Sequence, residues 1–325
     1  MRFPCPGRLT ALATSLLLPA ALLAQAAVDP GIAPRAAALA GSGQRGQATE
    51  LLGRYLATAP DDAGAWLELG RFYLLDARDW HREGHIEESP GSLYLDFAAT
   101  ALDQSLRLPS DSSRMLRSVV ELERAVLEVE RGGWTAFLAN AASLRASYPP
   151  VFVLELGRNL VASCPLGGVM VTGNDVETVG VWTVTIAGGE RGDLVLLLPA
   201  LYGEDSVYRA RMATALEIPP VLPVDAALTE VAARRPVCLT PAVPASYAPR
   251  KALVTHRLLQ VAGPAAAELP QPLTIAELAS AHLSQPNALT RAVLAEYRQA
   301  ARKNRVLCVS LLSPFGERTR SACGD

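Results

Sequence analysis

The polar residues best placed to do chemistry follow the first buried strand that the sequence predicts. Residues 169–172 are apolar up to a closing threonine, and a Gly-Asn-Asp turn at 173–175 leads into a segment of helix length that ends at Ala187. Open α/β sheets bind ligands at the carboxyl ends of their strands, so we expect a site at this turn. The candidate ligand-binding residues are Thr172, Asn174, Asp175, Glu177, Thr178 and Trp182.

Asp175 and Glu177 are the two acids of this segment, and paired carboxylates can serve as general acid and base or hold a divalent cation. Two residues apart at the start of a helix, however, they point in different directions. Helix capping and the helix dipole favour acids at such positions without any catalytic role. We therefore favour capping and assign no catalytic residue. The stretch also lacks the GxGxxG and GxxxxGK[ST] loops that hold nucleotide phosphates.

His81 and His85 are the other residues with metal-binding chemistry, because two histidines four residues apart can share one face of a helix. Three acids lie in the same segment: Glu83, Glu87 and Glu88. The spacing is not HExxH, Gly84 weakens a helix, and spacing fixes no third ligand. We interpret residues 77–95 as a solvated loop. The sequence predicts neither a bound metal nor a cofactor.

A β-α-β unit is expected to hold the candidate turn. Its second strand is the apolar run 194–198, which is too short to cross a membrane and is followed by Pro199, as is typical of a strand buried on both faces. Further strands are predicted at 235–240, 252–261 and 306–311, the second of them at the sheet edge. Helices are predicted at 151–162, 206–216, 225–234, 275–282 and 288–303. We expect a small α/β domain with a mostly parallel sheet of about four or five strands.

The first part of the chain has a helical pattern that repeats. Three sets of residues carry this pattern: Ala48, Leu52, Tyr55 and Pro60; Trp66, Leu69, Gly70 and Tyr73; and, after residues 77–95, Ala98, Leu102, Ser105 and Pro109. With these sets, residues 32–109 resemble tetratricopeptide repeats, in which small residues let paired helices approach and large ones fill the seam. The resemblance implies a concave surface that binds a protein or peptide partner.

Further helices at 110–130 and 134–148 end at Pro149-Pro150, where we place a domain boundary. The predicted fold class is α+α/β, with a helical repeat domain at 27–150 and an α/β domain at 151–325. We expect the helix 151–162 to pack onto the sheet, because the run 194–198 would otherwise expose a large apolar patch, and so to fasten the repeats to it.

The strand predicted at 169–172 leads into residues 172–182, which read TGNDVETVGVW. On this stretch, residues of about 157–262 resemble the soluble C-terminal tail of bacterial multi-spanning membrane proteins related to protein O-mannosyltransferases. Members of this family show a strand and then a pattern close to TNGDNDTFPLWY, with which residues 172–182 align without gaps. The shared residues are Thr172, Asp175, Thr178 and Trp182, with Glu177 at the second acid. The resemblance does not cover the membrane-embedded half that carries glycosyl transfer in this family. It therefore implies a soluble module and supplies no catalytic residue.

The N-terminus has the pattern of a secretory signal peptide. Arg2 and Arg8 precede or border an apolar run at 9–24, and Ala24-Gln25-Ala26 offers a small-x-small cleavage site. We expect residues 1–26 to be removed and the protein to be exported, to the periplasm or outside the cell. A retained anchor is the alternative, although a spanning helix needs ~20 apolar residues. No membrane span is expected after cleavage.

Four cysteines remain after such cleavage, an even number in an oxidising compartment. We expect Cys308 to pair with Cys323, and Cys164 with Cys238. Four buried thiols are the alternative.

The composition leaves two hypotheses for function. The chain is 50% hydrophobic and 19% charged with a net charge of −2, which provides for a buried core and argues against nucleic acid as a partner. The first hypothesis is a binding or scaffold protein of the cell envelope, with a protein or peptide partner on the repeats and a non-catalytic α/β module. The alternative is an enzyme or accessory subunit acting on envelope glycans, with residues 172–178 as its ligand site.

Overall fold

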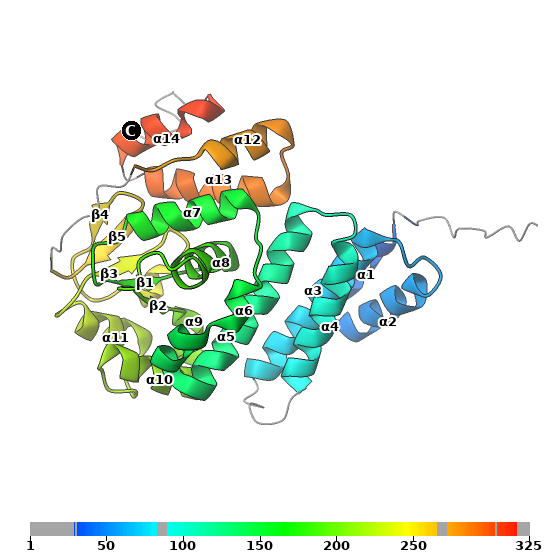
Figure 1. Ribbon diagram of the computed structural model, residues 1–325, viewed down its shortest axis with the longest axis horizontal. Helices are drawn as coiled ribbons and strands as arrows, with labels where there is room; N and C mark the ends of the chain where they lie inside the picture. Colours follow the sequence, from blue (N-terminus) through cyan, green and yellow to red (C-terminus); the bar gives the residue numbers. More distant parts are fainter. Residues whose placement is uncertain (1–28, 30, 83–89, 265–271, 303, 317–325) are drawn as a thin grey trace, which may run out of the picture.

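Five short strands form one mixed sheet within the part of the chain that the structure describes (Figure 1). The computed structural model describes residues 29, 31–82, 90–264, 272–302 and 304–316. β1 pairs in parallel with β2 and β3, whereas β5 is antiparallel to β3 and β4, in the spatial order β2-β1-β3-β5-β4. The strands are β1 (Val169–Val171), β2 (Val195–Leu197), β3 (Val237–Leu239), β4 (Val254–His256) and β5 (Leu259–Ala262).

The parallel part of the sheet contains the predicted β-α-β unit. α8 (Asp175–Trp182) and a π-helical turn (Thr183–Ala187) connect β1 to β2. All three parallel strands are buried along their whole length, as expected where helices cover both faces of a sheet. Because β2 and β3 lie on opposite sides of β1, the strand order reverses there. The carboxyl end of β1 is therefore the position where sheets of this kind bind ligands.

The prediction of one edge strand at 252–261 is wrong, because this segment is a β-hairpin. β4 and β5 pair with each other across a two-residue turn at 257 and 258, where Arg257 has a φ of 52°. Positive φ values suit such tight turns. Residues 252–261 contain neither glycine nor proline, so no common turn residue marks the place where the chain turns back.

The predicted last strand at 306–311 is also wrong, because these residues belong to a helix, α14 (Arg305–Leu312). Asn304 begins this helix by accepting a hydrogen bond from the backbone N–H of Leu307 (3.2 Å). A short apolar run does not distinguish a strand from a buried helix. The buried positions are three or four residues apart, which is helical spacing: Cys308, Leu311 and Leu312.

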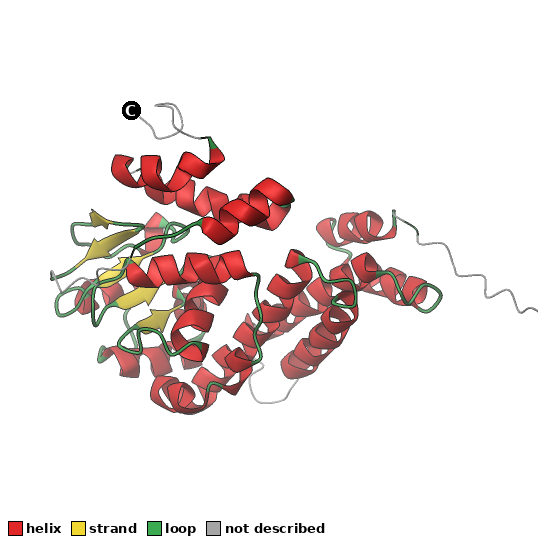
Figure 2. Ribbon diagram, turned by 45° about the horizontal axis from the view of Figure 1, so that its top comes forward, coloured by secondary structure: helices red, strands yellow, loops and turns green. Residues whose placement is uncertain are grey.

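Helices flank the sheet on both sides (Figures 1 and 2). In Figure 1, α12, α13 and α14 lie beside α7 above the sheet, and α9, α10 and α11 lie below it. The bounds of α7 and α10 agree with the prediction. These helices are α7 (Val151–Ala162), α9 (Pro199–Glu204), α10 (Ser206–Leu216), α11 (Val224–Val231), α12 (Ala276–Ser284) and α13 (Ala288–Ala301).

Six helices precede α7 among the described residues, and the first four pack as two pairs, α1 with α2 and α3 with α4. Gly70 allows the second pair to approach closely, since a Cβ atom at this position would lie 2.6 Å from Cγ of Leu102. Whether the pairs are tetratricopeptide repeats stays a prediction. The helices are α1 (Ile32–Gly41), α2 (Arg45–Leu56), α3 (Ala63–Arg82), α4 (Pro90–Ser105), α5 (Asp111–Asn140) and α6 (Ala142–Arg145).

The predicted loop at 77–95 is wrong at both of its ends. α3 continues through His81 to Arg82, and α4 begins at Pro90. His81 is therefore a helical residue whose side chain is only 13% exposed. His85 lies outside the described residues.

α5 joins the helical segment to the sheet. It packs against α3 and α4 and also against α8 and α10. Gly133, with a φ of 78°, kinks the helix, and the side chain of Arg211 on α10 donates a hydrogen bond to the carbonyl oxygen of Glu130 beside the kink (2.9 Å). α7, which we expected to fasten the repeats, packs chiefly against α8 and α12.

One apolar core extends across the boundary predicted at 150. It runs from Leu74 on α3 to Leu312 on α14, while a smaller core lies among α1, α2, α3 and α4. None of the described helices is both long and apolar enough to cross a membrane. The predicted signal peptide, 1–26, lies outside the described residues.

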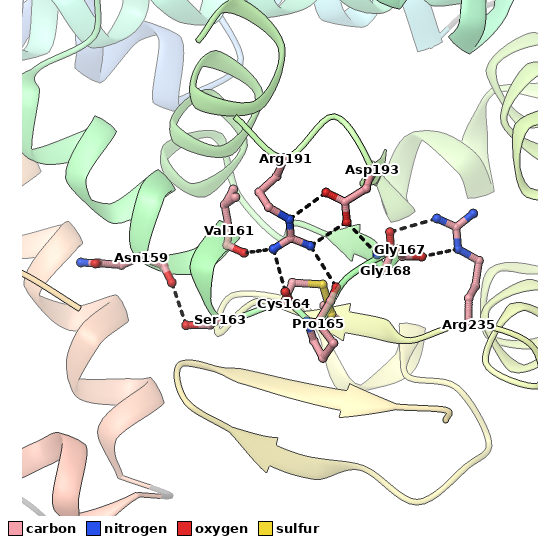
Figure 3. The surroundings of a disulfide bond; sticks show 11 residues. Asn159, Val161, Ser163, Cys164, Pro165, Gly167, Gly168, Arg191, Asp193 and Arg235 are labelled. Atoms are coloured by element: carbon pink, nitrogen blue, oxygen red, sulfur yellow. Dashed lines mark hydrogen bonds and ion pairs between the residues drawn. A yellow bond between two sulfur atoms is a disulfide. The ribbon is translucent and has the colours of Figure 1, made fainter. Parts of the chain in front are cut away.

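The predicted pair Cys164 and Cys238 lies at disulfide distance, with its sulfur atoms 2.09 Å apart (Figure 3). The bond ties the loop after α7 to the middle of β3. Beside it, the guanidinium of Arg191 donates to the carbonyl oxygen of Cys164 (2.8 Å) and pairs with Asp193 (2.8 Å). Cys323 lies outside the described residues, so its pairing with Cys308 stays a prediction.

Candidate functional site

A cavity of about 320 Å³ lies between the helical segment and the carboxyl ends of the parallel strands. The turns that follow β1, β2 and β3 form one wall, and α3 and α5 form the other. Four of the six predicted ligand-binding residues line it: Thr172, Asn174, Asp175 and Thr178. Further polar lining residues are Arg78, His81, Glu123, Glu204 and Tyr247, and the larger apolar ones are Leu122, Val126, Leu198 and Leu201.

Asn174 fixes the turn after β1 because it is the N-cap of α8. Its Oδ1 accepts a hydrogen bond from the backbone N–H of Glu177 (2.9 Å), and its Nδ2 donates to Oε1 of Glu296 on α13 (2.8 Å). The hydroxyls of Thr178 and Thr172 bond to each other (2.8 Å). These contacts satisfy the first open donors of the helix and orient the turn toward the cavity.

Asp175 connects the sheet to the helical segment through Arg78 of α3. The guanidinium donates to both carboxylate oxygens of Asp175 (2.8 and 3.1 Å) and to Oε1 of Glu123 (2.6 Å). The two carboxylates raise the pKa of Arg78 although burial lowers it. A bidentate pair of this kind is among the stronger hydrogen-bonded contacts, so the cavity rim carries a fixed pattern of charge.

Glu177 is not among the lining residues; it connects two turns of the sheet. Its Oε2 accepts hydrogen bonds from the Gly173 N–H (3.0 Å) and the Thr240 hydroxyl, and its Oε1 accepts one from the Ala242 N–H (3.0 Å). The turns after β1 and β3 touch here, since a Cβ atom at Gly173 would lie 2.2 Å from the carbonyl carbon of Ala242. The carboxyl group of Glu177 thus occupies the space between the turns after β1 and β3.

Glu177 and Glu296 form a buried carboxyl pair. Burial raises the pKa of Glu177 to about 7, and the charge of Glu296 adds to this effect, against the hydrogen bonds from Thr240, Gly173 and Ala242. Burial likewise raises the pKa of Glu296, against the hydrogen bonds that it makes with Asn174 and Glu177. The pair therefore retains a proton close to neutral pH, because two adjacent buried carboxylates do not both ionise easily.

Trp182 lies away from the cavity. It is fully buried and packs edge-to-face on Trp134, with ring centroids 5.7 Å apart, and on Phe137. It contributes to the interface between α5 and α8.

A polar group lies at the joint of α3, α5 and α10; the sequence singled out His81 in it, but not its two acidic neighbours. Nε2 of His81 lies 2.8 Å from Oε1 of Glu130 and 3.5 Å from Oδ2 of Asp205. Both carboxylates are buried, and Asp205 caps α10 by accepting from the Tyr208 N–H (2.6 Å). Burial lowers the pKa of His81, but the two acids raise it above its ordinary value. The three residues are 49 and 75 positions apart in the chain, so no spacing motif could have linked them.

Comparison of the chain with family models, curated proteins and solved structures found no match.

Proposed function

We propose that this chain is an exported binding protein of the cell envelope that holds a small ligand in the cavity between the helical segment and the sheet. The main support for this proposal is the set of residues that line the cavity. Polar residues that follow β1, including Asn174 and Asp175, face helices α3 and α5 across a cavity of about 320 Å³. A cleft of this size between two parts of a fold, with convergent polar groups, is where small molecules usually bind.

The lining favours a sugar or the end of a glycan as the ligand. Three acids, Glu123, Asp175 and Glu204, offer acceptors for hydroxyl groups, and Tyr247 offers a ring for the apolar face of a sugar. Asp175 and Asn174 are already held by protein contacts. Groups fixed in this way suit binding, because little ordering is needed when the ligand arrives.

The helical pairs support a second contact, with a protein or peptide. An open groove of about 460 Å³ lies on α1 and α2, lined by Arg35, Ala38, Leu39, Ser42 and Leu51. Paired helices present surfaces of this kind to peptide segments.

A glycan array probed with the purified protein tests the first part of this proposal. We expect binding to a restricted set of envelope sugars. A pull-down from envelope extract tests the second part, with Ala38→Arg as the matched variant, since this exposed residue lines only the groove. The wild-type protein should recover a partner that Ala38→Arg does not recover. An array without binding contradicts the sugar ligand, and equal recovery contradicts the groove.

One observation favours the alternative of an enzyme or accessory subunit acting on envelope glycans. The carboxyl pair of Glu177 and Glu296 retains a proton near neutral pH and adjoins Asn174, which lines the cavity. Perturbed carboxyl groups next to a cleft can supply acid or base catalysis. Mass spectrometry of array-positive glycans after incubation would distinguish the two functions. Product formed by the wild type and not by Glu296→Gln would support the enzyme.

A further inference from the structure

We propose that His81, Glu130 and Asp205 form a binding site for a divalent transition-metal ion, with Zn²⁺ as the best fit, beside the cavity. One ligand atom from each residue lies within 4.8 Å of the other two, and His81 Nε2 is 2.8 Å and 3.5 Å from the nearest oxygens of the acids. Ligands bound to one zinc ion at about 2.0–2.2 Å lie about 3–3.5 Å from each other. Small side-chain rotations therefore bring all three to one ion.

The burial of Glu130 is a second, independent observation that points to a ligand at this place. Its side chain is 1% exposed, and both carboxylate oxygens lack a hydrogen-bond partner. The polar neighbour of Oε1 is Nε2 of His81, 2.8 Å away, which is itself without a hydrogen-bond partner and makes an ion-pair contact with this oxygen. A buried carboxylate without hydrogen-bond partners is costly in a folded protein.

Charge and donor type set the class of metal. Two buried carboxylates beside one histidine carry two negative charges when the ring is neutral, and a divalent cation balances them. Imidazole favours zinc and the neighbouring transition metals over Mg²⁺ and Ca²⁺, which prefer oxygen ligands alone. Three protein ligands leave a fourth zinc position open. Since His81 lines the cavity, this position is available to water or to an oxygen of a ligand bound there.

The ion would also hold the joint of the fold together. His81 is on α3, Glu130 is on α5 just before the kink, and Asp205 is the N-cap of α10. No two of these helices are linked directly by a short loop. A common ion would cross-link the helical segment to the α/β part.

Metal-binding variants of the purified, chelator-treated protein test the proposal. Isothermal titration calorimetry with ZnCl₂ should give one ion per chain, and MgCl₂ should give no saturable heat. Glu130→Gln and His81→Gln should each weaken zinc binding by at least tenfold, an effect on the scale seen for changes at metal sites. Glu230→Gln is the matched control, because this exposed residue of α11 neither lines the cavity nor belongs to the group.

Crystals soaked in ZnCl₂ give the second readout, by anomalous scattering at the zinc edge. A peak between the three side chains supports the site even if a variant is unstable in solution. The proposal is overturned by a wild-type protein that takes up no zinc, by zinc whose peak lies elsewhere, or by affinity that is unchanged in both variants. If the wild type takes up no zinc, His81 serves only as an ion-pair partner of Glu130.

Discussion

Replacing Glu177 with Gln should destabilise the protein at acidic pH, because an amide cannot make all the contacts of the carboxyl group. Below its pKa the protonated carboxyl can still accept from the N–H groups of Gly173 and Ala242 while its own proton reaches Thr240 or Glu296. The amide nitrogen of glutamine donates only. Whichever way the amide turns, one of the two backbone N–H groups loses its acceptor.

The cost is that of one buried, unpaired backbone donor, about 1–3 kcal/mol. Urea unfolding at pH 5 followed by circular dichroism should measure it as a lower transition midpoint. The difference in transition midpoint between Glu177→Gln and the wild type should become smaller toward pH 8. At that pH the wild type is destabilised by a buried charge that the variant lacks. Glu296→Gln is the control: its carbonyl oxygen can still accept from Asn174 (2.8 Å) and its amide can donate to Glu177. If Glu177→Gln unfolds within about 0.5 kcal/mol of the wild type at pH 5, as surface substitutions do, Glu177 does not hold the two turns together.

Three further predictions concern the same framework. The pKa of Glu177 is raised to about 7 in the folded protein, so the native state binds more protons than the unfolded chain between pH 4.5 and 7; this group's contribution to the free energy of unfolding should fall by about 3 kcal/mol over that range. Glu296→Gln removes a charge that raises the pKa of Glu177, so the decrease in the free energy of unfolding should occur at lower pH in this variant. Urea titrations at a series of pH values measure it. A decrease at the same pH as in the wild type would show that Glu296 does not raise the pKa of Glu177. Leu156→Ala, at a fully buried position on α7, should cost about 2–5 kcal/mol by the same assay, and a cost typical of a surface residue would show that α7 is loosely packed. Cys164→Ser should cost about 2–5 kcal/mol by removing a cross-link between residues 74 positions apart, whereas an unchanged midpoint, or a native Cys238 that alkylates in the wild type, would refute the disulfide.

Local signals explain what could be predicted of the sheet. The apolar runs at β1 and β2 are separated by a glycine turn and a helix-length segment, and the β-α-β unit follows from these features alone. α10 begins after its N-cap Asp205, and α7 begins after Pro150, which cannot continue a preceding helix. The bounds of both helices were predicted correctly. The errors at 252–261 and 306–311 arose where short apolar segments fit two structures equally well.

The candidate site was predicted in part, for a physical reason. Residues that follow β1 had to gather at the end of their strand, and Asn174 and Asp175 do line the cavity. Their partners depend on tertiary packing: Arg78 is 97 positions from Asp175, and Glu296 is 122 positions from Asn174. The position of His81 beside Glu130 likewise depends on how α3 packs on α5. No spacing within one segment encodes such contacts.

Blocking the cavity tests the proposed function most directly. Ala200 is exposed and lines the cavity, whereas Ala210 is exposed on α10 and does not. Dissociation constants for the strongest array glycan should be measured by calorimetry for the wild type, Ala200→Trp and Ala210→Trp. Binding in the cavity predicts a loss of at least about tenfold, or 1.4 kcal/mol, for Ala200→Trp and no change for Ala210→Trp. Wild-type affinity in Ala200→Trp would place the ligand elsewhere and contradict the account.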